Sequence, residues 1–357
     1  MSEELDLIPH IERLAYAVGD APKATAQLKT KPEDFVVEEI LGFSPSGEGE
    51  HIYIHVKAID YNTEYLLSHI ARSLGVPKKS VVYSGLKDRY AVASQWFSVH
   101  LPGNEQVDLT PINNDNVTVL ESARNLKKLR RGAHKANRFT IRLRSVDGDK
   151  ESINARLESI QKQGFPNYFG PQRFGRNENN ITDALASVAS GRSPKKRFQR
   201  SIEFSTLRSL LFNLSLSERI KEGAWKDALP GDVFALSGTE SFFVPKGAEN
   251  GENEASEKDS IDSRLASGDI AVAGVLYGDG TLPQTDVAAE KLLEVFRPYA
   301  SIMEFLTSQR VAISVRPFSV LPKEFSYVWE DVDTLILSFS LPKGVFATSL
   351  LRECINC

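Results

Sequence analysis

One aspartate, Asp88, is placed as active-site carboxylates usually are. It lies in a short polar turn between two strand-like runs, within residues 81–99, with a cation on each side, Lys87 and Arg89. A carboxylate presented in such a turn can take part in nucleophilic or acid–base chemistry. Because neighbours in an extended chain point to opposite sides, we expect Lys87 and Arg89 to meet phosphate or solvent.

Other reactive residue types predict no metal and no cofactor. Cys354 and Cys357 form the spacing C-x-x-C, but no second pair and no histidines at ligand spacing accompany them. His51 and His55 share one face of a strand-like region without a third ligand, which favours a satisfied or exposed pair. The sequence also lacks a Walker loop, a dinucleotide fingerprint and a Gly-x-Ser-x-Gly elbow.

Positive charge is concentrated in two clusters, although the formal net charge is −4. The first cluster, within residues 121–144, holds nine cations and one acid, and acids concentrate elsewhere, notably in 249–259. Its cations are Arg124, Lys127, Lys128, Arg130, Arg131, Lys135, Arg138, Arg142 and Arg144, and those of the second cluster are Arg192, Lys195, Lys196, Arg197 and Arg200. This separation favours a surface that binds a polyanion, with solvated faces as the alternative.

The composition is typical of an ordinary soluble globular protein. A chain of 357 residues with 41% apolar and 25% charged residues is long enough for two domains. No stretch approaches the roughly 18 to 20 uncharged apolar residues of a membrane span, and the N-terminus is acidic where a secretory signal is basic. We therefore expect a cytoplasmic protein that does not enter the membrane.

Residue periodicity predicts a sheet with packed helices in the first part of the chain. Strands are expected at 35–40, 52–57, 94–101 and 138–144. The last of these alternates apolar residues with arginine and threonine, so one face should pack and the other should be basic. A helix should begin at Asn62 or Thr63 and end before Gly75.

A change of pattern near residue 160 predicts a domain boundary. From about 165 to 310, helical segments such as 207–220 alternate with short strands such as 232–236 and 241–244, and 247–259 has the composition of a disordered loop. A strand at 335–341 and a short helix from Ala347 are too little for a domain of their own, so they should pair with the first sheet. We therefore predict one domain from 1–162 and 316–357, with 163–315 inserted.

Four separated motifs resemble the tRNA pseudouridine synthase D (TruD) family. They are Lys29-Thr-Lys-Pro-Glu-Asp-Phe35, Gly85-Leu-Lys-Asp88, Asn167-Tyr-Phe-Gly-Pro-Gln-Arg-Phe-Gly175 and Leu341-Pro-Lys-Gly-Val-Phe-Ala-Thr348. The resemblance runs from about Lys29 to the C-terminus. It implies an α+β fold, in which a pseudouridine synthase catalytic domain with a mixed, largely antiparallel sheet and packed helices is interrupted by a family-specific α/β insertion domain.

The resemblance implies a cofactor-free isomerase that turns a tRNA uridine, at position thirteen of certain tRNAs, into pseudouridine. It assigns the catalytic carboxylate to Asp88. In a partly buried site the ionised form needs a nearby cation, because burial disfavours charge. The family's motif makes Lys29 that cation.

The resemblance also implies the contacts to a flipped-out base. Phe35, Phe139 and Phe346 would surround the uracil, and the Asn137 amide would contact the substrate. Core packing is the alternative for each phenylalanine, most of all for Phe139, which alternates with other apolar residues. Ala136 stands where glycine is frequent in the family.

Two segments are candidates for RNA backbone contacts. In 124–138 we assign this role to Lys127, Lys128, Arg130 and Arg131, because such cations position RNA without reading its bases. In the third family motif, Arg173, with Arg176, could clamp phosphate, or the segment could act as a hinge between domains.

Two other functions compete with the isomerase, which we expect to act as a monomer on tRNA without a nucleotide cofactor. One is an RNA-binding or RNA-folding factor with vestigial catalysis, which loss of Asp88 or Lys29 would have favoured. The other is a glycosidase for free nucleosides, which the two basic clusters disfavour.

Overall fold

The computed structural model describes residues 13–103, 106–175, 178–245 and 254–357, and these form two compact units. The sheet unit comprises residues 22–154, 322–347 and 355–357. The helical unit comprises the described residues of 13–21, 155–321 and 348–354. The predicted domain division at residues 162 and 315 stays a prediction.

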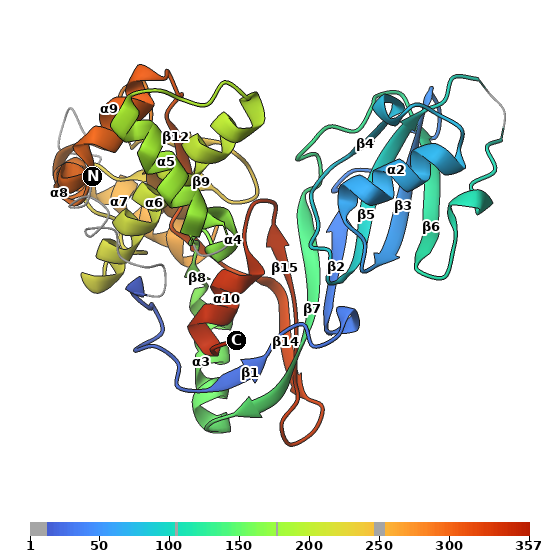
Figure 1. Cartoon of the computed structure of the whole chain (residues 1–357). Coiled ribbons are helices and arrows are strands. Elements are labelled where there is room, and N and C mark those ends of the chain that lie inside the picture. Colours follow the sequence, from blue (N-terminus) through green and yellow to red (C-terminus); the bar gives the residue numbers. More distant parts are fainter. Residues whose placement is uncertain (1–12, 104–105, 176–177, 246–253) are drawn as a thin grey trace. The chain divides into compact units, whose positions relative to one another are not determined.

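The sheet unit is built on a nine-stranded sheet that draws strands from both ends of the chain (Figure 1). Its main order is β14-β15-β7-β2-β5-β3-β6, with β1 on β7 and β4 on β5. The strands are β1 (Thr25–Gln27), β2 (Phe35–Ile40), β3 (His51–Ile59), β4 (Val81–Tyr83), β5 (Val92–His100), β6 (Val117–Asn125), β7 (Ala136–Asp147), β14 (Lys323–Trp329) and β15 (Leu335–Pro342). The described pairings are antiparallel except that of β2 with β5, which confirms the predicted fold class.

The long strand β7 lies between strands from the two ends of the chain. It pairs with β2 on one side and with β15 on the other, so the C-terminal strand does return to the first sheet as predicted. Phe139, Ile141 and Leu143 are buried, in line with the predicted alternation. Strands β6 and β14 were not predicted.

Helix α2 (Thr63–Ser73) covers part of one face of this sheet (Figure 1). The Asn62 side chain caps it by accepting the Glu64 N–H at 2.9 Å. Its apolar stripe, including Leu66 and Ile70, is fully buried in one core cluster with strands β3, β4 and β5. Short 3-10 turns η2 (Pro32–Asp34), η3 (Lys78–Ser80) and η4 (Thr110–Ile112) connect the strands.

The helical unit surrounds a small antiparallel sheet of order β10-β9-β11-β12, with a separate β8–β13 pair. Its strands are β8 (Phe165–Pro166), β9 (Val233–Leu236), β10 (Phe242–Phe243), β11 (Ile270–Leu276), β12 (Ser314–Pro317) and β13 (Ser319–Val320). Its helices are α4 (Pro171–Phe174), α5 (Asn179–Ser190), α6 (Arg197–Lys221), α7 (Glu254–Ala266), α8 (Asp286–Phe296), η6 (Arg297–Tyr299) and α9 (Ala300–Ser308). Helices α3 (Lys150–Gln163) and α10 (Ala347–Cys354) each cross a unit boundary.

The predicted disordered loop at 247–259 is wrong in its second half. Residues 254–259 begin helix α7, whereas 247–253 lie outside the described residues. The glutamates there are good helix formers, and this outweighed the polar composition on which the prediction rested. None of the helices in the described part of the chain combines the length and apolarity needed to cross a bilayer.

The polar face of β7 is neutralised by acids that lie far away in sequence. Arg138 bonds Glu324 at 2.9 Å, and Arg142 bonds Glu330 at 2.9 Å. The predicted basic face is therefore largely a set of ion pairs.

The third arginine of this face, Arg144, makes a forked contact with a buried carboxylate. Its Nε and Nη2 donate to Asp34 at 2.8–3.0 Å, and Asp34 also accepts the Lys31 N–H at 3.0 Å. Burial by itself would raise the pKa of Asp34, but the hydrogen bonds and charge of Arg144 outweigh it and hold that pKa below its ordinary value. This pair fixes the segment that leads into β2.

We predict that Asp34→Asn lowers the free energy of unfolding by about 1–3 kcal/mol at pH 7, because the charged acceptor of Arg144 is lost. The folded-state pKa of Asp34 is depressed, so the stabilisation is present above the ordinary aspartate value and disappears as pH falls through the folded value. Urea denaturation between pH 7 and pH 2.5 should therefore show the two proteins converging in acid. Glu330→Gln, at a more exposed pair, is the control and should cost under about 1 kcal/mol. A difference that does not vary with pH would contradict this account.

Candidate active site

Asp88 lies in the loop that joins β4 to β5, as the sequence indicated. Several hydrogen bonds hold this loop to neighbouring elements. Thr63 Oγ1, in the first turn of α2, accepts the Lys87 N–H at 3.0 Å, and the Tyr90 hydroxyl donates to the Thr30 carbonyl at 3.2 Å. The second bond ties the Asp88 loop to the segment that carries Lys29.

Lys29 and Asp88 are in direct contact. Lys29 Nζ donates to Asp88 Oδ2 at 2.6 Å and lies 4.1 Å from the centroid of the Phe35 ring. The Asp88 side chain is 52% exposed and the Lys29 side chain 25%. Lys29 also has φ of +58°, a left-handed conformation that strains a non-glycine residue. The arrangement presents a carboxylate to solvent beside an ammonium held in a fixed place.

Lys87 does not meet phosphate or solvent, so that expectation was wrong. Its side chain is 5% exposed, and Nζ donates to Glu39 Oε1 at 2.6 Å and to Asn137 Oδ1 at 3.0 Å. Glu39 is fully buried, and its other oxygen accepts the Trp96 N–H at 2.9 Å. A buried carboxylate requires such a partner, and only tertiary contacts supply it.

Gly85 permits this close approach. A β-carbon added there would lie 2.7 Å from Glu39 Oε1 and 2.9 Å from Lys87 Nζ. Both distances are shorter than β-carbons show, so any other residue here would displace the ends of the two paired side chains. Arg89, in contrast, is 71% exposed and pairs with Asp60, as expected for a solvent-facing residue.

A serine and a histidine extend the buried polar cluster. Ser84 Oγ lies 2.7 Å from His134 Nδ1 and accepts the His134 N–H at 2.8 Å. Burial, the largest effect, lowers the pKa of His134, so the ring is neutral at pH 7. His134 Nε2 is 3.5 Å from Asn137 Nδ2.

Sequence reasoning missed Glu39, Ser84 and His134 as parts of the site. One signal could have found the glutamate. It follows Phe35 and Val37 at the buried phase of β2, where a charged residue is out of place.

Three of the predicted base-contacting residues lie on one face of the sheet. Cross-strand register pairs Glu39 with Asn137 and Val37 with Phe139. The Phe35 and Phe139 rings meet edge to face, with centroids 6.0 Å apart. Both are buried, so the alternative of core packing accounts for much of their surface, and their contact with a base stays a prediction.

Phe346, the fourth predicted base contact, follows β15 in the turn before α10 and is partly buried. The end of β15 lies beside the start of β7, because Leu341 pairs with Asn137. The turn after it is held by Lys343, whose Nζ donates to the Gly132 carbonyl at 2.9 Å. Its role toward a base also stays a prediction.

The predicted RNA-backbone residues of the sheet unit surround one buried leucine. Leu129 packs against the sheet and its N–H donates to Ser98 Oγ at 3.0 Å. Lys127, Lys128 and Arg130 are exposed on either side of it. The leucine therefore holds the loop between β6 and β7, residues 126–135, here called the Leu129 loop, while its neighbours face solvent.

Arg131, the fourth of these residues, is partly engaged by the protein. Its Nη2 donates to the Tyr83 hydroxyl at 2.7 Å, and that hydroxyl donates to Glu64 at 2.5 Å. Burial and then the bond to Glu64 raise the pKa of Tyr83 to about 12. Arg131 is thus less available to a ligand than its neighbours.

Arg173, predicted to clamp phosphate, lies in the helical unit and is partly buried there. Its Nη1 donates to Ser205 Oγ at 2.8 Å, its guanidinium lies 5.4 Å from the Phe169 ring, and burial lowers its pKa. The Asn213 amide bonds both the N–H and the carbonyl of Phe169, each at 2.9 Å. These contacts describe a structurally fixed loop, so the phosphate contact stays a prediction. Arg176 lies outside the described residues.

No group of three or more histidine, cysteine, aspartate or glutamate residues suited to a metal ion occurs in the described part of the chain. The His55 ring stacks on Trp96 and its Nδ1 lies 3.3 Å from a Glu121 oxygen. Cys354 is a buried free thiol and Cys357 an exposed one.

The family model described as tRNA pseudouridine synthase D (TruD) matches residues 12–188 and 197–354. The chain belongs to this family. A tRNA pseudouridine synthase D from Aeromonas salmonicida (strain A449) is 40% identical over 343 residues, which is 96% of this chain and 94% of that protein. One from Pseudomonas fluorescens (strain Pf0-1) is 40% identical over 340 residues, 95% of this chain and 94% of that protein.

A solved structure supports the fold of this TruD family member. A Methanosarcina mazei protein described as a tRNA pseudouridine synthase D (TruD) superposes with a TM-score of 0.72 and covers 97% of this chain and 96% of its own. Its sequence identity is 20%, so the match bears on the fold alone.

We predict that Lys87→Met lowers the free energy of unfolding by about 3–5 kcal/mol, because it leaves the Glu39 carboxylate buried without its cation. The double variant Glu39→Gln, Lys87→Met should recover at least about 1 kcal/mol of this loss, since no charge is then stranded. Urea denaturation of the four proteins of the cycle measures both effects. Arg89→Met, on the other side of Asp88, is the control and should change stability by under about 1 kcal/mol. Additive losses in the cycle would show that the pair is not coupled.

Proposed function

We propose that this protein isomerises uridine to pseudouridine in tRNA and that Asp88 supplies the catalytic carboxylate. The observation that carries the proposal is the contact between Asp88 and Lys29 above the Phe35 ring, in a chain that belongs to the TruD family. The relatives named tRNA pseudouridine synthase D match nearly the whole chain, so both units have counterparts in them.

The reaction needs one carboxylate and no external group. The bond between C1′ of the ribose and N1 of uracil breaks, the base turns, and C5 bonds to C1′. C5 then loses its proton to water and N1 gains one, so that atoms balance. Asp88 can assist by attacking C1′ or by removing a ribose proton, and both routes require the carboxylate beside the sugar.

Lys29 has the role of holding that carboxylate. Its ammonium contacts one Asp88 oxygen and leaves the other for the substrate. Because the Asp88 side chain is half exposed in the free protein, bound RNA would exclude water from it and strengthen the electrostatic interaction with Lys29.

The aromatic face beside Asp88 suits a flipped-out base. A uracil removed from its stack can regain about 1–3 kcal/mol by contact with aromatic rings, and in this proposal the rings are those of Phe35, Phe139 and Phe346. The Asn137 amide, whose Oδ1 accepts a hydrogen bond from Lys87 Nζ at 3.0 Å, would bond the uracil. The exposed cations Lys127, Lys128, Arg130 and Arg131 would contact the RNA backbone.

We further propose that the protein acts as a cytoplasmic monomer, that tRNA is its partner and that the target is uridine thirteen. The family and the names of the relatives support tRNA as the partner, and the family resemblance implies uridine thirteen.

We predict that Asp88→Asn abolishes turnover while tRNA affinity stays within about threefold of wild type, because the change removes chemistry and leaves phosphate contacts intact. Tritium release from C5 of labelled uridine in an unmodified tRNA transcript measures turnover, and filter binding measures affinity. Asp60→Asn, at a half-exposed aspartate that pairs with Arg89, is the matched control and should release tritium at the wild-type rate.

Two outcomes would change the assignment. Tight tRNA binding with no release by wild type would favour the RNA-binding factor with vestigial catalysis. A large loss of tRNA affinity in Asp88→Asn would make Asp88 a structural residue.

We predict that Lys127→Gln, Lys128→Gln and Arg130→Gln together raise the Kd for tRNA and lower the slope of log Kd against log salt by about 2, because each phosphate contact releases condensed counterions. Binding measured from 50 to 300 mM salt gives both quantities.

The control for this triple variant neutralises three exposed cations at the end of α2 and in η3, Arg72, Lys78 and Lys79. It makes the same change in net charge and should leave the slope within about 0.5 of wild type. Equal effects in the two variants would remove the Leu129 loop from the RNA surface.

A further inference from the structure

The loop between α5 and α6, residues 191–196, carries the second basic cluster of the sequence. Together with the first turn of α6 it presents Arg192, Lys195, Lys196, Arg197 and Arg200. No described carboxylate lies within 4.0 Å of any of these cations. The cluster therefore differs from the β7 arginines, which the protein neutralises itself, and its charge is available to a ligand.

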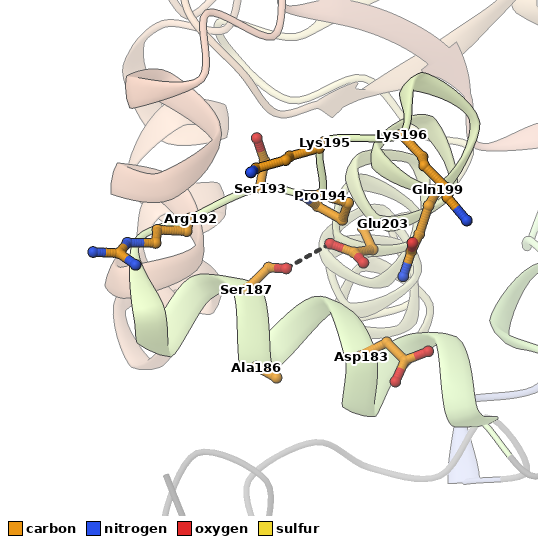
Figure 2. A pocket seen from close by; sticks show the side chains of 10 residues that line it. All are labelled: Asp183, Ala186, Ser187, Arg192, Ser193, Pro194, Lys195, Lys196, Gln199 and Glu203. Carbon is orange, nitrogen blue, oxygen red and sulfur yellow. Dashed lines mark hydrogen bonds between the residues drawn. The ribbon is translucent and has the colours of Figure 1, made fainter.

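This α5–α6 loop forms the rim of a shallow pocket of about 470 Å³ (Figure 2). Helix α5 supplies one wall through Asp183 and Ser187, and α6 supplies another through Gln199 and Glu203. Figure 2 shows Lys195 and Lys196 on the side of the pocket opposite α5, with Arg192 at one end. The cations thus stand around the pocket, and the acids lie in its wall.

The acids restrict where an anion can bind. Glu203 is buried and accepts a hydrogen bond from Ser187 at 2.6 Å, and burial raises its pKa. Asp183 also faces the pocket. A phosphate is therefore favoured at the rim, beside the loop cations, and disfavoured within the pocket.

The start of α6 adds to the attraction at the rim. This helix is 25 residues long, has no side-chain hydrogen bond at its N-cap Lys196, and has no acid in its first turn. Its first N–H groups and the positive end of its dipole favour a negative ligand. Phe198, in the same turn, is 79% exposed and places a large apolar ring among the cations.

Cations that follow a loop beside an exposed aromatic ring form the combination that binds the backbone and bases of single-stranded nucleic acid. The cations contact phosphates, and the ring stacks on a base of any type. An acidic protein surface would pair with the cations but would make no stacking contact with the ring.

The family model leaves this loop unmatched. The family model matches residues up to 188 and again from 197, so the unmatched stretch 189–196 contains Arg192, Lys195 and Lys196.

We propose that the α5–α6 loop and the first turn of α6 form an additional RNA-contact surface, which binds backbone phosphates of the tRNA at Arg192, Lys195 and Lys196 and stacks an unpaired base on Phe198. The proposal rests on the proposed function and deepens it by naming a second surface for the same substrate. The surface contributes affinity and takes no part in the chemistry at Asp88.

The test neutralises the unmatched loop with Arg192→Gln, Lys195→Gln and Lys196→Gln. The triple variant should bind an unmodified tRNA transcript about tenfold more weakly at 150 mM salt, and the slope of log Kd against log salt should fall by about 2. Its kcat for tritium release at saturating tRNA should equal that of wild type, while KM rises by the same factor as Kd.

A matched control neutralises three exposed cations of the same unit, Lys162, Lys221 and Arg297, each of which pairs with an acid on its own helix or in the adjoining helical turn. It makes the same change in net charge and should leave Kd within about twofold. Phe198→Ala should weaken binding about fivefold or more with an unchanged salt slope, because stacking releases no counterions.

Three results would overturn the proposal. The first is a triple variant whose Kd for tRNA and salt slope equal those of wild type, and the second is an equal loss of tRNA affinity in the control. The third is a triple variant that loses binding to polyglutamate but keeps binding to tRNA, which would identify an acidic peptide as the partner. Failure of the proposed function is separable: wild type would then release no tritium, yet its tRNA binding would still depend on the loop.

Discussion

The buried ion pair between Lys87 and Glu39 is the constraint on which the candidate site depends. A fully buried carboxylate in the middle of a sheet is stable only with a cation and hydrogen-bond donors around it, and here these are Lys87 and the Trp96 N–H. The requirement draws the loop between β4 and β5 down onto the sheet. Because consecutive side chains point to opposite sides, an inward Lys87 directs Asp88 outward, to Lys29 and solvent. Glycine at position 85 lets the loop come close enough.

Whether a cation of this protein is neutralised depends on its partners in the folded structure more than on its position in the sequence. The β7 arginines meet Asp34, Glu324 and Glu330, so that much of one basic segment serves stability. The Leu129 loop and the α5–α6 loop retain cations that no described carboxylate pairs with, except for Arg131. Under the two RNA-contact proposals, the substrate would supply the missing negative charge, and a chain of net charge −4 could then bind a polyanion.

Much of the fold followed from local pattern. Helix α2 was predicted with Asn62 or Thr63 as its cap, and Asn62 is the cap, since capping and the apolar stripe are local properties. The alternation of Phe139, Ile141 and Leu143 predicted the packed face of β7. Strands β6 and β14 were missed because each buries a single side chain and gives no alternating apolar signal. The helical start at 254 was missed because loop composition and helix propensity conflict there.

The sequence by itself determined the family, the fold class and the identity of Asp88 and Lys29 as candidate catalytic residues, because family motifs and local periodicity are properties of the linear chain. Only the tertiary structure decided which charges are neutralised and which are free. Arg144 and Asp34 are 110 residues apart, and Lys87 and Glu39 are 48 apart. Electrostatic energy depends on distance and burial in space, and both are established only when distant strands pair. The same reason turned Lys87 from an expected phosphate contact into the buried cation that holds the site.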